Sequence, residues 1–403
     1  MNRITTLLIL AGAIGVGLLL YRLLVPPQED VESFLGHHWE RPIPFQGPPP
    51  AAFSDLEASL DPQSCAQCHA EQHADWKQSL HSETFSPGLR WQLQLMTPEQ
   101  GKSCLQCHAP MSEQVTLVAA ERGWPGAPAE APPAHIPRDL HEQGLACAAC
   151  HVRKHERVGP PPRDPNIDPE QGPHGGFTAK AAFKDSRFCA ACHQFPEDGP
   201  RVNGKLRENT VVQWQQSRHA EEGRTCQRCH MPGRRHQWRG IHDPAMTASA
   251  LETTFQVSDD RVVAAVSNTG AGHHFPTYMV PEIELRLERV AADGKRQALA
   301  REIIAWRTNL ALTEELFDTR IKSGETRELE ADLSPALAQN ESLELVMAVA
   351  PRRLYERTFE DYQQRQGDKL DPAVRALLTL SIAEAKNSHY QRILARYPAR
   401  VAN

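Results

Sequence analysis

All ten cysteines of this 403-residue chain fall into five copies of one short motif, Cys-x-x-Cys-His. The copies are CAQCH (65–69), CLQCH (104–108), CAACH (147–151), CAACH (189–193) and CQRCH (226–230). Such a run attaches haem c, because its two thiols form thioether bonds to the porphyrin and its histidine binds the iron. Structural zinc or disulfides would not require histidine after every pair. We therefore expect five covalently bound haem c groups.

The motifs assign a role to fifteen residues. Haem attachment is predicted for Cys65, Cys68, Cys104, Cys107, Cys147, Cys150, Cys189, Cys192, Cys226 and Cys229, and proximal iron ligation for His69, His108, His151, His193 and His230. Successive motifs start 39, 43, 42 and 37 residues apart. A unit of that size cannot bury a core of its own, so we expect a mainly α-helical, loop-rich domain (61–245) whose interior is largely haem.

Five irons also need up to five distal ligands, and the chain has more histidines than places for them. WKQSLH and WQQSRH share the pattern Trp-x-x-Ser-x-His, which favours His81 and His219, since the indole can pack on a porphyrin beside the imidazole. His236 and His242 follow the fifth motif and are further candidates. The alternative for each is a surface or hydrogen-bonded histidine. Three more histidines in proline- or glycine-rich loops stay open: His135, His141 and His174.

The N-terminus predicts the compartment. Residues 4–25 carry one charge, Arg22, and as a helix would span roughly the 30 Å of a bilayer core. No small-residue cleavage site follows, which favours an uncleaved transmembrane signal anchor (1–25) over a removed signal peptide. We expect a single-pass protein of the bacterial inner membrane with most of the chain in the periplasm. Residues 26–60, with PPQ and QGPPP, indicate a proline-rich stalk.

The charge balance limits the classes of partner that the sequence predicts. A formal net charge of −6 provides no basic field, so nucleic acid is not an expected partner. We expect redox partner proteins instead, one donating and one accepting electrons.

Beyond residue 250 the pattern changes. RVVAAVS (261–267), EIELRLERV (282–290) and ESLELVMAVAP (341–351) read as strands, and ADG and SGE as turns. They predict an antiparallel, immunoglobulin-like β-sandwich (250–360). Asp371 and Pro372 then have the residue types of a helix start, which predicts a C-terminal helix to about residue 387 and a tail (370–403).

Several motifs resemble those of a known group. The two W-x-x-S-x-H segments, GLACAACH followed closely by a histidine, and CQRCHMP are similar to multihaem cytochromes of the cytochrome c-554 type, relatives of the haem domains of hydroxylamine oxidoreductase. The resemblance covers about residues 60–245 and implies stacked haem pairs and distal roles for His81 and His219. The fifth motif and the long C-terminal part depart from it. Some members of the group have a five-coordinate haem.

A second resemblance concerns NTGAGHHFPT (268–277). It resembles the GAGHxFPT loop of β-domains fused to multihaem cytochromes, and the resemblance implies that His273 is a haem ligand. The alternative is a β-turn with exposed histidines.

Together these features predict a membrane-anchored pentahaem cytochrome that relays electrons in the periplasm. The alternative is a nitrite- or hydroxylamine-type oxidoreductase with one open iron. Five uniform motifs without a lysine variant, and the surplus of histidines, favour the carrier. A third hypothesis is that the β-domain docks a redox partner.

Overall fold

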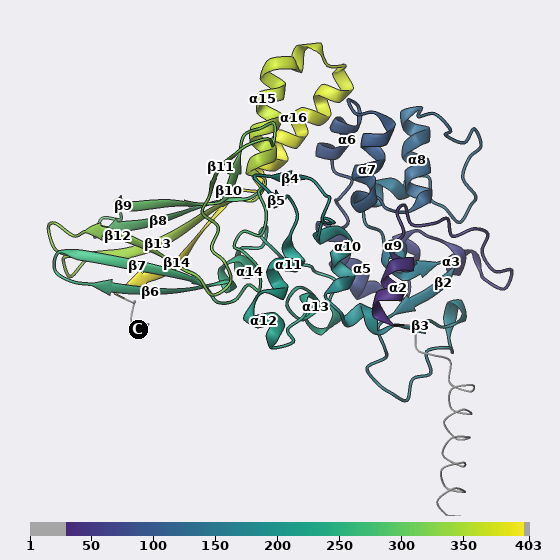
Figure 1. Ribbon diagram of the computed structural model, residues 1–403, viewed down its shortest axis with the longest axis horizontal. Coiled ribbons are helices and arrows are strands. Elements are labelled where there is room, and N and C mark those ends of the chain that lie inside the picture. The colour runs from purple at the N-terminus through teal and green to yellow at the C-terminus, as the bar shows by residue number, and fades with distance from the viewer. Residues whose placement is uncertain (1–29, 399–403) are drawn as a thin grey trace, which may run out of the picture.

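The computed structural model describes residues 30–398, which form a helical region and an elongated β-domain that extends from it (Figure 1). The predicted membrane segment lies outside the described residues and stays a prediction. Within residues 30–398, no helix is long and apolar enough to cross a membrane.

The region before residue 250 consists of short helices joined by loops. Its α-helices are α2 (Val31–His38), α3 (Asp55–Ala58), α4 (Pro62–Cys65), α5 (Ala70–Lys77), α6 (Pro87–Leu93), α7 (Pro98–His108), α8 (Ser112–Arg122), α9 (Cys147–His151), α10 (Arg187–His193), α11 (Thr210–Gln215), α12 (Arg218–Glu221), α13 (Cys226–His230) and α14 (Pro244–Ser249). Four of them, α7, α9, α10 and α13, end at the histidine of a motif. The helix ends therefore set where these imidazoles lie.

Sheet is sparse in this region, as expected. The strands β1 (Val152–Arg153), β2 (Glu156–Gly159), β3 (Thr178–Ala179), β4 (Arg201–Val202) and β5 (Lys205–Leu206) have two to four residues each. Single turns of 3₁₀ helix occur at η1 (Leu140–Gln143), η2 (Pro173–Gly175), η3 (Ala181–Lys184) and η4 (Pro232–Arg234).

The predicted stalk needs a correction over its described part. Phe34 and Ile43 are buried, and the Ile43 N–H donates to the Pro110 carbonyl at 2.8 Å. Ile43 also shares an apolar cluster with Leu60 and Met111. The segment therefore packs onto the helical region, because burial of its scattered apolar side chains is favourable there. Its proline content had favoured a stalk instead.

The β-domain contains two larger antiparallel sheets. One has the order β12-β7-β6 and the other β14-β13-β8-β9. The strands are β6 (Leu251–Val257), β7 (Arg261–Asn268), β8 (Glu282–Val290), β9 (Arg296–Ile304), β12 (Thr326–Asp332), β13 (Ser342–Ala350) and β14 (Tyr390–Tyr397), with a separate hairpin of β10 (Trp306–Thr308) and β11 (Glu315–Asp318). The antiparallel sheets agree with the prediction, and the immunoglobulin-like topology stays a prediction.

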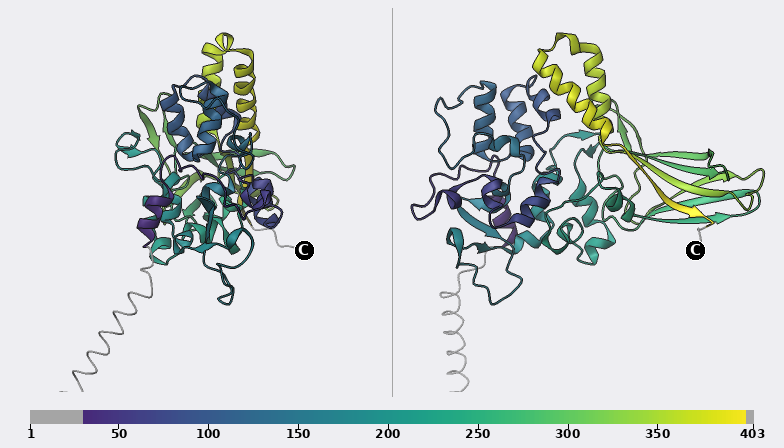
Figure 2. Two further views of the ribbon diagram at one scale, coloured as in Figure 1. Left: turned by 90° about the vertical axis from the view of Figure 1, so that its right-hand side faces the viewer. Right: turned by 180° about the vertical axis from the view of Figure 1, so that it is seen from behind.

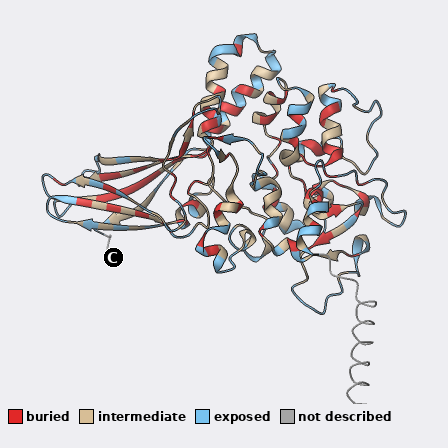
Figure 3. Cartoon of the chain, viewed as in Figure 1, coloured by how far each residue is buried: buried red, intermediate tan, exposed pale blue. Residues whose placement is uncertain are grey.

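In β7 and most of β8, the alternation of apolar and polar residues that predicted these strands is also the pattern of their burial. Every second residue of β7 is buried, and Leu285 and Leu287 of β8 lie opposite Met347 and Leu345 of β13. These side chains belong to one apolar cluster that draws on both sheets, and Figure 3 shows the buried positions along the strands. The predicted antiparallel strands are confirmed.

The C-terminal part differs from its prediction at two places. The helix opened by Asp371 is confirmed as α16 (Pro372–Asn387), but a second helix, α15 (Arg353–Gln366), precedes it, followed by the turn η5 (Gly367–Lys369). The predicted tail instead forms β14, which pairs with β13. Figures 1 and 2 show α15 and α16 as a helical pair beside α6, where Trp91 meets Phe359 at 5.1 Å between ring centres.

Candidate metal centres

Three motif histidines share one orientation. Their Nδ1 atoms lie 2.7 to 2.8 Å from backbone carbonyls, that of Thr84 for His108, Val158 for His151 and Arg239 for His230. A carbonyl only accepts, so Nδ1 carries the proton and Nε2 keeps its lone pair. This is how proteins prepare an imidazole to bind a metal through Nε2.

Three motif histidines each face a second histidine within the described residues. The ring centres are 6.3 Å apart for His230 and His273, with nearly parallel rings at 11°. They are 6.3 Å apart for His193 and His81, and 6.1 Å for His151 and His236. Because metal–imidazole bonds are about 2 Å long, one iron between two imidazoles separates the ring centres by roughly 6 Å. These pairs therefore fit two axial ligands of a haem iron.

Burial keeps these imidazoles in the form that binds metal. It lowers the pKa of His81 to about 3, aided by the neighbouring His193, and lowers the pKa of His151 and of His273 to about 4. All three are neutral at pH 7, as a metal ligand must be. The Nδ1 atom of His81 is buried without a hydrogen-bond partner.

The segment that carries His236 is tied to the first motif's region. Asp75, at the end of α5, is buried and accepts from Arg235 Nε at 2.6 Å and from the His236 backbone N–H at 3.0 Å. The hydrogen bond from Arg235 is the largest cause that lowers the pKa of Asp75 to about 2. A charged carboxylate thus anchors the chain directly before the imidazole that faces His151.

Comparisons with known proteins bear on the family and on the fold. Residues 64–126 match the family described as cytochrome c554 and c-prime. This match and the five Cys-x-x-Cys-His motifs support a multihaem c-type cytochrome. Its fold is similar to that of a penta-heme cytochrome c552 from Thermochromatium tepidum, with a TM-score of 0.55, 20% identity, and coverage of 85% of this chain and 98% of that chain. No curated protein matches it.

Two predicted distal ligands of the cytochrome lie in other surroundings. His219 is 6% exposed, and its Nε2–H donates to the Thr269 carbonyl at 3.0 Å. His242 is near Arg352, and burial first, then that guanidinium, lowers its pKa to about 4. In the described chain no ring contact joins either of them to a motif histidine. The hydrogen bond to Thr269 favours a role for His219 in holding the loop of residues 268–277. Iron ligation by His219 and by His242 stays a prediction.

Two further histidines lie near the motifs: His174, which was an open candidate in the sequence, and His38, which the sequence did not indicate. His174 lies close enough to lower the pKa of His69, second to burial, and its own Nδ1–H donates to the Gly176 carbonyl at 2.8 Å. His38 precedes the first motif, outside the part of the sequence that predicted iron ligands. It is 2% exposed with both ring nitrogens unpartnered among the described residues, and it packs between Phe34 and Phe188. No motif around His38 in the sequence indicates an iron ligand.

The motifs of the cytochrome also adjoin one another in a definite order. Cysteines of different motifs lie side by side: Cys65 beside Cys147, Cys107 beside Cys192, and Cys189 beside Cys226. Motif one therefore adjoins three, two adjoins four, and four adjoins five, while the third motif's Cys150 lies near Cys189. Two thiols are exposed: Cys68 in the first motif and Cys229 in the fifth.

Proposed function

We propose that this cytochrome carries five haem c groups and relays electrons without transforming a substrate. The observation that carries the proposal is the pairing of His151, His193 and His230 with a second histidine at a distance that one iron spans. An iron with both axial positions occupied has no place for a substrate, so it is restricted to outer-sphere electron transfer. The haem supplies the reversible redox change, and the imidazoles hold it in place.

The order of the motifs supports a relay. Motifs one, three, four and five adjoin in sequence, with motif two beside four. The exposed cysteines, Cys68 and Cys229, belong to the two ends of that order. We propose that a donor protein docks near one end and an acceptor near the other.

The proposed location rests on the sequence. Residues 4–25 would anchor the chain in the inner membrane, with its haem-bearing part in the periplasm. Membrane fractions should therefore release the cytochrome with detergent and not with salt. Release by salt alone, or a mature chain that lacks about the first 25 residues, would contradict the anchor.

Three measurements on the purified chain test the function. The intact mass should exceed that of the polypeptide by five haems, because the chain holds ten motif cysteines. A redox titration should take up five electrons per chain, and the protein should not turn over nitrite or hydroxylamine. A mass with fewer haems, or steady turnover of either compound, would overturn the proposal.

One observation favours an open iron at the second motif as a second candidate function. Among the described residues, no ring contact joins His108 to another histidine, although its Nδ1 is held by Thr84. Tyr355 is 41% exposed and lies within electrostatic range of Cys104 and of Tyr278. A nitrite- or hydroxylamine-type oxidoreductase would use that iron. Binding of one cyanide per chain, together with nitrite turnover, would establish this reading, and absence of both would exclude it.

A further inference from the structure

The loop of residues 268–277 is held from inside the β-domain by Asn268. This side chain is fully buried, and its Nδ2 donates to the carbonyls of His273 at 2.9 Å and of Ile321 at 3.0 Å. Its Oδ1 accepts from the Ala271 N–H at 3.2 Å. Asn268 therefore fixes the loop to the sandwich at the residue whose imidazole faces His230.

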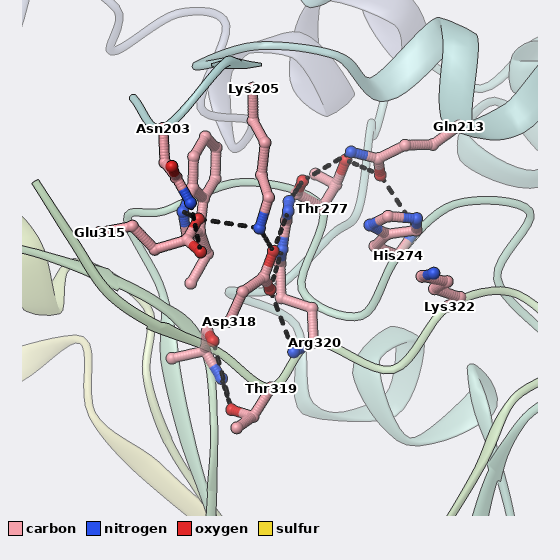
Figure 4. A network of polar contacts seen from close by, with 12 residues as sticks. Asn203, Lys205, Gln213, His274, Thr277, Glu315, Asp318, Thr319, Arg320 and Lys322 are labelled. Atoms are coloured by element: carbon pink, nitrogen blue, oxygen red, sulfur yellow. Dashed lines mark hydrogen bonds and ion pairs between the residues drawn. The ribbon is translucent and has the colours of Figure 1, made fainter. Parts of the chain in front are cut away.

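The helical region holds the other side of the loop through Gln213 of α11. Gln213 is 6% exposed, and its Oε1 accepts from the His274 N–H and from the Thr277 hydroxyl, each at 3.0 Å. Its Nε2 donates to the Thr277 carbonyl at 3.1 Å. One amide thus makes three contacts with the chain that directly follows His273 (Figure 4).

A charged network continues from the same carbonyl. Arg320 donates to the Thr277 carbonyl at 2.7 Å and to both oxygens of Asp318 at 2.8 Å. Asp318 also pairs with Lys205 of β5 at 2.7 Å, and Lys205 pairs with Glu315 at 2.8 Å. Figure 4 shows this chain of contacts from the β4–β5 hairpin to the loop. The network therefore bridges the two parts of the molecule.

We propose that Gln213 and Arg320 are positioning residues that hold His273 on the iron of the fifth motif, so that the contact between the two parts sets the coordination of that haem. This inference rests on the proposed function. The residues that follow His273 are clamped from the helical region, while its own carbonyl is clamped from the sandwich. The imidazole can reach the iron only when both parts are docked.

The test uses the full-length protein with its haems. Gln213→Ala removes all three contacts and Arg320→Gln breaks the bridge. Each should lower the apparent dissociation constant for exogenous imidazole at one haem by about tenfold, since His273 no longer competes as well. A high-spin ferric signal from a fraction of one haem should accompany the change. Asn203→Gly is the matched control, because the Asn203 side chain contacts the network at Glu315, and glycine suits the positive φ of 49° at this turn.

The outcomes separate the two claims. If His273→Ala produces one high-spin haem while Gln213→Ala and Arg320→Gln leave imidazole binding and spin state unchanged, the positioning role is wrong and the proposed ligation stands. If His273→Ala itself changes nothing, the ligation fails. Should Gln213→Ala not accumulate with its haems, Gln213→Glu keeps the shape and both acceptor contacts and loses only the donor. An unchanged spectrum in that variant would equally overturn the role.

Discussion

At the residue scale, the sequence predicts the attachment sites as a complete set, whereas it names more candidate distal histidines than there are irons. Three of those candidates, His81, His236 and His273, lie opposite motif histidines. A Cys-x-x-Cys-His motif is local, so every residue it needs is adjacent. Tertiary packing decides which histidine lies opposite each motif histidine. It brings His81 to His193 and His236 to His151 from distant parts of the chain. His219 shares its local motif with His81 but has different surroundings, because its imidazole contacts the Thr269 carbonyl and no motif histidine among the described residues.

A substitution at His236 tests this choice. The sequence names both His236 and His242 as candidates and places His242 first, whereas the structure places His236 across from His151. We predict that His236→Ala keeps all haems attached and converts one to a high-spin form that binds cyanide, because attachment uses only cysteines. His242→Ala is the control and should remain low-spin. Electron paramagnetic resonance of both oxidised variants checks this, and the reverse pattern would exchange the two roles.

At the element scale, the loop of residues 268–277 depends on two glycines that let it approach its neighbours. A Cβ added at Gly270 would lie 2.1 Å from the Ser249 carbonyl oxygen, and one at Gly272 would lie 3.0 Å from the Trp214 ring. The glycines were visible in the sequence, but what they approach was not. Helix α16 was predictable because Asp371 and Pro372 mark its start, whereas β14 exists only through its pairing with β13.

We predict that Gly270→Ala displaces this loop. A backbone oxygen cannot move aside as a side chain can, so the free energy of unfolding should fall by about 1 to 3 kcal/mol. Because the loop carries His273, a high-spin fraction of one haem should appear as well. Gly36→Ala, in α2 with nothing within 4 Å of the added carbon, is the control and should not lower stability. Denaturant unfolding and spin-state spectroscopy test both variants, and full stability in Gly270→Ala would refute the close approach.

At the scale of the whole molecule, the helical region and the β-domain are joined by packing and by a charged bridge. The sequence predicted both parts, and it predicted the link through His273 only from a resemblance. It could not predict that Lys205 pairs with Asp318, because a charge pattern does not name its partner. It also missed α15, whose sequence is strongly polar and whose Phe359 is buried in a cluster with Trp91 of α6 and with Leu378 and Ile382 of α16.

The bridge should make the molecule sensitive to acid. Burial alone would raise the pKa of Asp318, but hydrogen bonds from Arg320 and Lys205 outweigh burial and hold it well below its usual range. A depressed pKa means that this carboxylate stabilises the fold above its unfolded pKa of about 4, and that the stabilisation is lost as the pH falls below that value. We predict a loss of about 1 to 3 kcal/mol of unfolding free energy from this group.

Urea unfolding between pH 6 and pH 2 measures this contribution. Asp318→Asn should be less stable than the natural protein at pH 6, and the difference should shrink towards low pH. A difference that stays constant with pH would show that the charge of Asp318 does not contribute.

The central claim is that this cytochrome holds its irons between pairs of histidines. Quantitative low-temperature electron paramagnetic resonance of the fully oxidised holoprotein tests it most directly. Low-spin ferric signals should account for the haems of motifs three, four and five at least, and any high-spin signal should amount to no more than the haems of motifs one and two. A spectrum in which high-spin haem accounts for more than two irons per chain would contradict the paired ligation.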